Sequence, residues 1–367
     1  MNSAVFNEEA PQGWPLFTTI PELRSKFQPG TKFIVAIGGW GDTEGFDAAA
    51  RDEETRARWS RNVAKMVHDL GADGVDVDWE YPGYVVPGWS TALRLSCPAT
   101  TRQQPLTRRR GNGDDYKQVP NSEKAWEIAA YPLLLKSLRK VLGQGKLITA
   151  AFPGLERDML AFTPETIPQI LESVDFINVM TYDMLNRRDN VTNHQSGIAL
   201  SRTAIEAYMA RGATPDKLNL GLPFFVKWFL TEPCPNPENA IGCPMPLLED
   251  PQTGSDLGKS GAFSFHDEVP AELAPSYNRA LTEGKHDKVG GGYYYWDAGE
   301  NRFWTFDTPQ AIRPKFPVLV EGMGLGGVFA WGLGEDANEF AHLKVVDEEL
   351  RRLAEKKRAK KESKSEL

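Results

Sequence analysis

Three carboxylates alternate with apolar residues in the segment GADGVDVDWEYPG, residues 71–83, where Asp76, Asp78 and Glu80 occupy every second position. If this segment is a strand, successive side chains point to opposite faces, so the three acids share one face. Residues two apart on a strand lie roughly 7 Å apart. Burial and like charge both raise a carboxyl pKa, so we expect the row to retain at least one proton near neutral pH. A general acid needs such a proton, and Glu80, the longest acid and the nearest to the strand end, is the expected donor.

Two other interpretations of this acidic row stay open at this point. Three acids on one face would also suit a divalent cation, because such ions prefer carboxylate oxygens. A purely structural cluster is less favoured, since unpaired buried carboxylates are costly. The five histidines are scattered and no His or Cys spacing resembles a zinc site, so we expect no metal and no cofactor.

The overall charge limits the classes of partner. The 367 residues include 42 Lys and Arg against 50 Asp and Glu, which gives a net charge of -8 at pH 7. A nucleic acid or an anionic membrane requires a basic face, so we expect neither as a partner and a neutral substrate instead. No apolar run approaches the ~18 residues of a membrane span. The N-terminus lacks the basic-then-apolar pattern of a signal peptide, and we expect a soluble monomer.

Short apolar runs alternate with longer amphipathic segments along the chain. The runs predicted as strands are 32–39, 73–79, 146–152, 175–182, 218–225 and 326–333, and the clearest predicted helices are 53–70 and 124–143. This alternation predicts a parallel sheet covered by helices, and the number of units at this length favours a (β/α)8 TIM barrel over an open doubly wound sheet. In such a barrel the chemistry collects at the carboxyl ends of the strands. The polar and aromatic residues predicted there are Glu80, Tyr182, Asp183 and Trp331.

Two segments depart from this pattern near the C-terminus. Residues 229–290 are rich in Pro, Gly and acidic residues with weak periodicity, which predicts a small insertion subdomain between late barrel units. Within it, Cys234 and Cys243 could close a small disulfide loop, and Cys97 is then the odd cysteine. Residues 343–367 are predicted to form a charged, solvated helical tail.

The segment DGVDVDWE, residues 73–80, resembles the D-x-x-D-x-D-x-E signature of glycoside hydrolase family 18, the chitinases and their relatives. Three further motifs follow the family's order: AIGGW at 36–40, MTYD at 180–183 and GGVFAWGL at 326–333. The resemblance covers roughly residues 33–333, and GGYYYWD and NRRDNVT look closest to chitinases of filamentous fungi. It implies a catalytic barrel made of residues 1–228 and 291–342.

The resemblance also implies a role for each motif residue. Glu80 would protonate the glycosidic oxygen while the substrate's own N-acetyl oxygen attacks C1 to form an oxazolinium ion, the substrate-assisted exception to the two-carboxylate scheme. Asp78 would orient the acetamido N–H and share a proton with Asp76, and Tyr182 would hydrogen-bond the acetamido oxygen. The remaining residues that the resemblance assigns to substrate binding are Gly39, Trp40, Tyr81, Met180, Asp183 and Trp331.

Purely structural roles remain possible interpretations for several of these aromatic and polar residues. Trp331 could simply fill the core, and Tyr182 could cap a strand end, as could Asp183. Three other tryptophans, Trp228, Trp296 and Trp304, could extend a sugar-stacking platform, but core packing is favoured for them.

The chain departs from the family pattern directly after the acidic row. Residues 84–110 contain five arginines, Cys97 and no acid, and excising these 27 residues rejoins DWEYPG to GNGDDYKQ, which is family-like. We interpret this foreign insert as a translated intron, with a genuine lid loop as the competing interpretation. Little sequence precedes the predicted strand at Phe33. We therefore expect the first barrel strand to be missing, which would leave sheet edges exposed. The resemblance implies an extracellular protein, so we expect that a signal peptide is missing as well.

The leading hypothesis is endo-hydrolysis of β-1,4-linked N-acetylglucosamine, with chitin or its oligosaccharides as the substrate. An endo-β-N-acetylglucosaminidase acting on glycoprotein glycans shares the acid and the mechanism. A chitin-binding lectin on the same fold is less favoured, because lectins of this type typically lose the acid and Glu80 is intact. A non-functional product of a faulty gene model is the last alternative.

Overall fold

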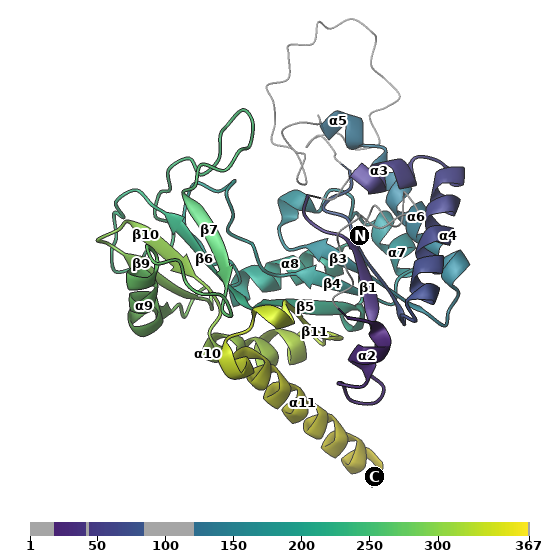
Figure 1. Ribbon diagram of the computed structural model, residues 1–367. Coiled ribbons are helices and arrows are strands. Elements are labelled where there is room, and N and C mark those ends of the chain that lie inside the picture. Colours follow the sequence, from purple (N-terminus) through teal and green to yellow (C-terminus); the bar gives the residue numbers. More distant parts are fainter. Residues whose placement is uncertain (1–17, 42–43, 84–120, 366–367) are drawn as a thin grey trace, which may run out of the picture. The chain divides into compact units, whose positions relative to one another are not determined.

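The structure is a computed structural model that describes residues 18–41, 44–83 and 121–365 (Figure 1). The predicted insert at 84–110 lies outside the described residues, and so do residues 1–17, on which the prediction of a missing first strand depends. The chain forms two compact units. The first comprises Met1–Ile177 and Ala210–Ala213, and the second Asn178–Met209 and Thr214–Leu367.

Six strands form one sheet, hydrogen-bonded in the order β1-β2-β3-β4-β5-β11. Their bounds are Ile34–Gly38 (β1), Gly74–Asp78 (β2), Leu147–Pro153 (β3), Phe176–Met180 (β4), Leu218–Pro223 (β5) and Gly327–Trp331 (β11). Each lies on one of the six predicted runs to within one residue. The pairs β1 with β2, β2 with β3, and β5 with β11 are parallel. This parallel order of strands is the one that the alternation of strands and helices predicts.

The first unit contains seven described helical segments, and α4 shows how capping and apolar periodicity define one of them. They are α2 (Ile20–Arg24), α3 (Glu44–Ala50), α4 (Glu53–Asp69), α5 (Asn121–Lys124), α6 (Glu127–Leu142), η2 (Glu156–Asp158) and α7 (Thr166–Leu171). At the start of α4, the Asp52 side chain accepts the Thr55 N–H while Thr55 bonds back to the Asp52 N–H, which is a reciprocal cap. The buried face of α4 carries Trp59 and Val63. Helices α4 and α6 lie side by side (Figure 1).

The second unit contains an antiparallel sheet in the order β7-β6-β10-β9-β8. Its strands are Phe225–Leu230 (β6), Ser260–Ser264 (β7), Lys285–His286 (β8), Tyr293–Asp297 (β9) and Arg302–Thr305 (β10). The sheet therefore extends beyond the expected insertion, residues 229–290, at both ends. The reason is local: only Phe224 separates β5 from β6, so the apolar run continues across a change of sheet that periodicity does not reveal.

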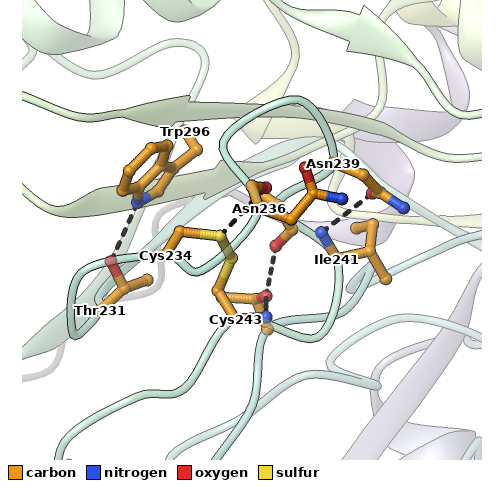
Figure 2. Close-up of a disulfide and its surroundings, with 9 residues drawn as sticks. Thr231, Cys234, Asn236, Asn239, Ile241, Cys243 and Trp296 are labelled. Atoms are coloured by element: carbon orange, nitrogen blue, oxygen red, sulfur yellow. Dashed lines mark hydrogen bonds between the residues drawn. A yellow bond between two sulfur atoms is a disulfide. The ribbon is translucent and has the colours of Figure 1, made fainter.

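Each face of this antiparallel sheet has its own apolar core. Val226 and Trp304 pack with Tyr277 of α9 (Ala274–Glu283) on one face. On the other face Phe229 and Phe303 pack with the half-cystines. Cys234 and Cys243 form a disulfide, which confirms the predicted pairing (Figure 2).

The rest of the second unit consists mainly of helices. These are α8 (Ile198–Ala210), η3 (Pro215–Lys217), α10 (Pro309–Ile312), η4 (Phe316–Glu321), η5 (Leu333–Glu335), η6 (Asn338–Phe340) and α11 (Ala341–Ser365). The predicted charged tail is helical in α11, but Val345, Val346 and Leu353 are buried, so its first half is packed rather than solvated. No helix in the described part of the chain is long and apolar enough to cross a membrane.

Candidate active site

Strand β2 places the three acids as the alternation predicts. Val75 and Val77 are fully buried on one face, and Trp79 is 1% exposed, stacked on Phe46 with ring centroids 5.2 Å apart. The acids alternate with these residues. Asp76 is half-buried, and its register partner on β3 is Thr149, whose hydroxyl donates to Asp76 Oδ1. A neighbouring strand therefore fixes the orientation of the first acid.

Asp78 is the most deeply buried acid of the row, with 8% of its surface exposed. Burial, followed by the charges of Glu80 and Asp76, raises the pKa of Asp78 to about 8. Among the residues that the structure describes, its Oδ1 has no hydrogen-bond partner. The sequence-based expectation that the row retains a proton near neutral pH therefore has a structural cause, which lies at Asp78.

Gly38, the last residue of β1, and Gly39 directly after it lie beside Asp78. Gly38 is its register partner and has φ +98°, and a Cβ there would lie 2.1 Å from the Asp78 carbonyl oxygen. Gly39 donates its N–H to that same carbonyl at 2.8 Å. A Cβ on Gly39 would lie 3.8 Å from Asp78 Oδ2. The two glycines therefore permit close backbone approach and leave one side of the carboxyl uncovered by a side chain.

Glu80 and Tyr81 follow the end of β2, joined by a cis peptide bond. Glu80 is half-buried, whereas Tyr81 is 8% exposed. Burial first, and then the charge of Glu80, raises the pKa of the Tyr81 hydroxyl. The Tyr81 ring meets the Trp40 ring edge-on at 6.4 Å, and Trp40 is 49% exposed. The first unit thus brings together Asp76, Asp78, Glu80, Tyr81, Gly39 and Trp40.

In the second unit, Tyr182 follows β4 and is 8% exposed. Its ring lies edge-on to Phe225 and Phe329, each at 5.9 Å. Gly221 of β5 makes room for this ring, because a Cβ there would lie 2.8 Å from Tyr182 Cε1. Tyr182 is therefore fixed by packing on three sides, which a residue that only caps a strand end does not require.

Asp183 carries an ion pair in the second unit. Its backbone has φ +54°, and Lys227 Nζ donates to Asp183 Oδ1 at 2.6 Å. Glu335 belongs to the same charged group: burial first, then the charges of Asp267 and Asp183, raise its pKa. The Asp183 side chain is 54% exposed while that of Lys227 is 13% exposed. The carboxylate is thus held by a nearly buried cation and still faces solvent.

The two remaining candidates of the second unit stand at strand ends. Met180 is the last residue of β4 and is buried. Trp331 is the last residue of β11, and its carbonyl accepts the Phe224 N–H at 2.8 Å. With 53% of its surface exposed, Trp331 does not fill the core, which favours the interpretation of Trp331 as a surface for stacking.

The sequence profile of "Glycosyl hydrolases family 18" matches residues 1–336. The chain belongs to glycoside hydrolase family 18. It is 25% identical over 321 residues to Chitinase 1 of Aphanocladium album, covering 84% of this chain and 63% of that relative. The chain thus spans less than two thirds of the length of that relative.

Solved chitinase structures share the fold. A chitinase from Rhizomucor miehei matches with a TM-score of 0.67 and 19% identity over 90% of this chain and 86% of its own. A chitinase from Cycas revoluta, solved in complex with (GlcNAc)3, matches with a TM-score of 0.62 and 21% identity over 89% of this chain and 83% of its own. The sequence predicts a (β/α)8 barrel with an inserted subdomain, and this fold prediction agrees with the similarity to these solved structures.

Several residues that act on the candidate site residues are absent from the sequence-based list. Thr149 and Lys227 hold Asp76 and Asp183 respectively. Tyr131 lies near the acidic row: burial first, then the charges of Asp76 and Asp78, raise its pKa. The position of Thr149 could have been found by aligning the two predicted strands. Lys227 gives no such signal, because it lies in β6, beyond the change of sheet.

The three other tryptophans belong to the cores of the second sheet. Trp304 is fully buried, and Trp228 and Trp296 pack against the two apolar clusters. Trp296 also donates its indole N–H to Thr231 Oγ1 (Figure 2). Core packing, the favoured interpretation, therefore describes all three. Among the described residues, no group of three His, Cys, Asp or Glu side chains is arranged to hold a metal ion.

Proposed function

We propose that this chain is a chitinase that hydrolyses internal β-1,4 linkages between N-acetylglucosamine units, with retention and with assistance from the substrate. The acidic row of β2 carries the proposal: Asp78 holds a proton at neutral pH while Glu80 stands half-exposed beyond the strand end. Family membership supports the same reaction class. The matched relatives named chitinases support chitin as the substrate.

Cleavage starts at Glu80, which donates its proton to the glycosidic oxygen as the C1–O bond breaks. The acetamido oxygen of the same sugar attacks C1, so the electron pair of the broken bond leaves with the protonated alcohol and an oxazolinium ion forms. The ionised Glu80 then accepts a proton from water as that water attacks C1. Opening of the oxazolinium ring restores the acetamido group, and the configuration at C1 is retained.

Asp78 acts on the acetamido nitrogen in this proposal. Its Oδ1 has no partner among the described residues, so it is available to accept the acetamido N–H. As positive charge develops on the oxazolinium ring, the Asp78 proton passes to Asp76, whose carboxylate is oriented by Thr149. The resulting negative charge on Asp78 stabilises the intermediate.

The residues of the second unit are assigned by the family motifs. Tyr182 donates to the acetamido oxygen and holds it beneath C1, a proximity effect that contributes several kcal/mol in well-oriented systems. Asp183 accepts sugar hydroxyls, and Trp331 offers an exposed indole face to the reacting sugar. Gly39, Trp40, Tyr81 and Met180 complete the proposed substrate contacts.

The decisive experiment is Glu80→Gln, assayed with a chromogenic chitotriose substrate. Removing a general acid lowers kcat by roughly 10²–10⁴-fold, while the Kd for chitotetraose, measured by calorimetry, stays within about threefold. Glu54→Gln, at an exposed position in the first turn of α4, is the matched control and keeps full activity. Undiminished cleavage by Glu80→Gln refutes the assignment.

Assistance by the substrate is tested by the choice of sugar. A chromogenic cellotriose substrate has a hydroxyl in place of the acetamido group, so it offers no internal nucleophile and is not cleaved. Proton NMR of the first products from chitotetraose should show the β-anomer at C1. Cleavage of the cellotriose substrate, or an initial α-anomer, contradicts the substrate-assisted, retaining mechanism.

Action on glycoprotein glycans is the second candidate, because it needs the same acid and the same acetamido group. It predicts a mobility shift of a high-mannose glycoprotein on gels, with a single N-acetylglucosamine left on asparagine.

The disulfide supports an oxidising compartment, and we place the protein outside the cell. Alkylation of the protein isolated from its source, followed by mass spectrometry, tests this placement by counting free thiols.

A further inference from the structure

The segment after β2 is anchored at Gly83, three residues beyond the proposed acid Glu80. The Gly83 N–H donates to Glu127 Oε2 at 2.8 Å, and this hydrogen bond is buried. Gly83 has φ +76°, and a Cβ there would lie 2.3 Å from Ile128 Cγ1. The segment therefore closes directly onto the first turn of α6, where Glu127 is the first residue.

Glu127 is a buried carboxyl with two further charged neighbours. It is 1% exposed, and so is Lys124. Burial first, and then the charge of Asp47 on α3, raise the pKa of Glu127 to about 8, whereas the Gly83 N–H and Lys124 act in the opposite direction. Glu127 and Asp47 are also joined by a side-chain hydrogen bond. Two carboxyl groups joined in this way share one proton.

We propose that Glu127 is a positioning residue for the proposed hydrolysis: joined to Asp47 and buried beside Lys124, its carboxyl oxygen fixes Gly83 and thereby the segment that carries Glu80. This inference rests on the proposed function of Glu80.

The consequence of losing this anchor is specific to catalysis. Glu80 lies after the last residue of β2, and Gly83, three residues further on, is held by Glu127. A displacement of about 1 Å in a catalytic group costs on the order of 100-fold in rate. Of the proposed substrate contacts only Tyr81 lies in this segment, so KM should change much less than kcat.

Three substitutions of Glu127 separate positioning from simple folding. Glu127→Gln keeps an oxygen for the Gly83 N–H and donates from its amide to Asp47, so kcat stays within about threefold of the wild type. Glu127→Asp retains the carboxyl group but withdraws it by one methylene, and Glu127→Ala removes it. Both of these lower kcat about 10–100-fold while KM for the chromogenic chitotriose substrate changes less than threefold. Ser137→Ala, also on α6, removes a hydrogen bond with Ser60 and leaves kcat unchanged.

Thermal unfolding of each variant shows whether it is folded, and Glu127→Asp provides the test if Glu127→Ala does not fold. Wild-type kcat in Glu127→Asp, or an equal loss of kcat in Glu127→Gln and Glu127→Asp, overturns the proposal. Glu80→Gln is assayed in parallel. If the wild type is inactive, or if Glu80→Gln remains active, the proposed function fails. If both behave as proposed and Glu127→Asp keeps full activity, only the role of Glu127 fails.

Discussion

The proton on Asp78 has a consequence for stability that can be measured without substrate. The pKa of Asp78 is raised to about 8 in the folded chain, whereas an aspartate in an unfolded chain titrates near ~3.9. Between these values the folded chain keeps a proton that the unfolded chain releases. The free energy of unfolding therefore falls as pH rises, by about 1.36 kcal/mol per pH unit. The contribution is complete below the lower pKa and is lost as pH rises through the folded value.

Asp78→Asn removes this titration. Asp78 is protonated in the folded chain and ionised in the unfolded chain from pH 5 to pH 7. Over these two units the wild type should therefore lose about 2.7 kcal/mol of unfolding free energy relative to the variant. Urea unfolding, followed by tryptophan fluorescence at both pH values, measures this double difference, from which any constant effect of the substitution cancels.

Asp52→Asn is the control for the measurement. The Thr55 backbone N–H lowers the pKa of Asp52, which is exposed at the start of α4, so Asp52 is ionised in both states from pH 5 to pH 7. Its substitution leaves the pH dependence in that range unchanged. Parallel pH dependences for the wild type and Asp78→Asn would show that Asp78 is ionised at neutral pH and would refute the reasoning.

Three further predictions follow from the geometry. Gly38→Ala places a Cβ 2.1 Å from the Asp78 carbonyl oxygen and should lower the free energy of unfolding, measured by urea titration, by about 3 kcal/mol. A loss below about 1 kcal/mol would contradict the close approach of the two backbones. Thr149→Val removes the donor to Asp76 and should cost about 1–2 kcal/mol of stability together with a lower kcat in the chitotriose assay. Tyr182→Phe should lower kcat by roughly 10²-fold with little change in stability, and unchanged kcat would remove Tyr182 from the proposed mechanism.

Much of the site could be predicted because its signals are local. The period-two alternation of acids with Val75 and Val77 depends only on strand geometry, and the structure places the acids as that period requires. Glu127 could not be found in this way. A glutamate in the first turn of an amphipathic helix is ordinarily exposed, and its burial here depends on Gly83, 44 residues earlier in the chain. Strand β6 escaped prediction for a related reason, since hydrophobicity does not record which sheet a strand joins.

The disulfide between Cys234 and Cys243 lies in one of the two apolar cores of the antiparallel sheet, so this core depends on the redox conditions in which the protein folds. Closing a loop between residues nine apart in sequence stabilises the folded chain by about 2–3 kcal/mol in the chain-entropy description. Both sulfurs lie within the cluster that includes Phe229 and Phe303. Protein made in a reducing cytosol would therefore carry two thiols within this cluster and would lack the stabilisation that closing the loop provides.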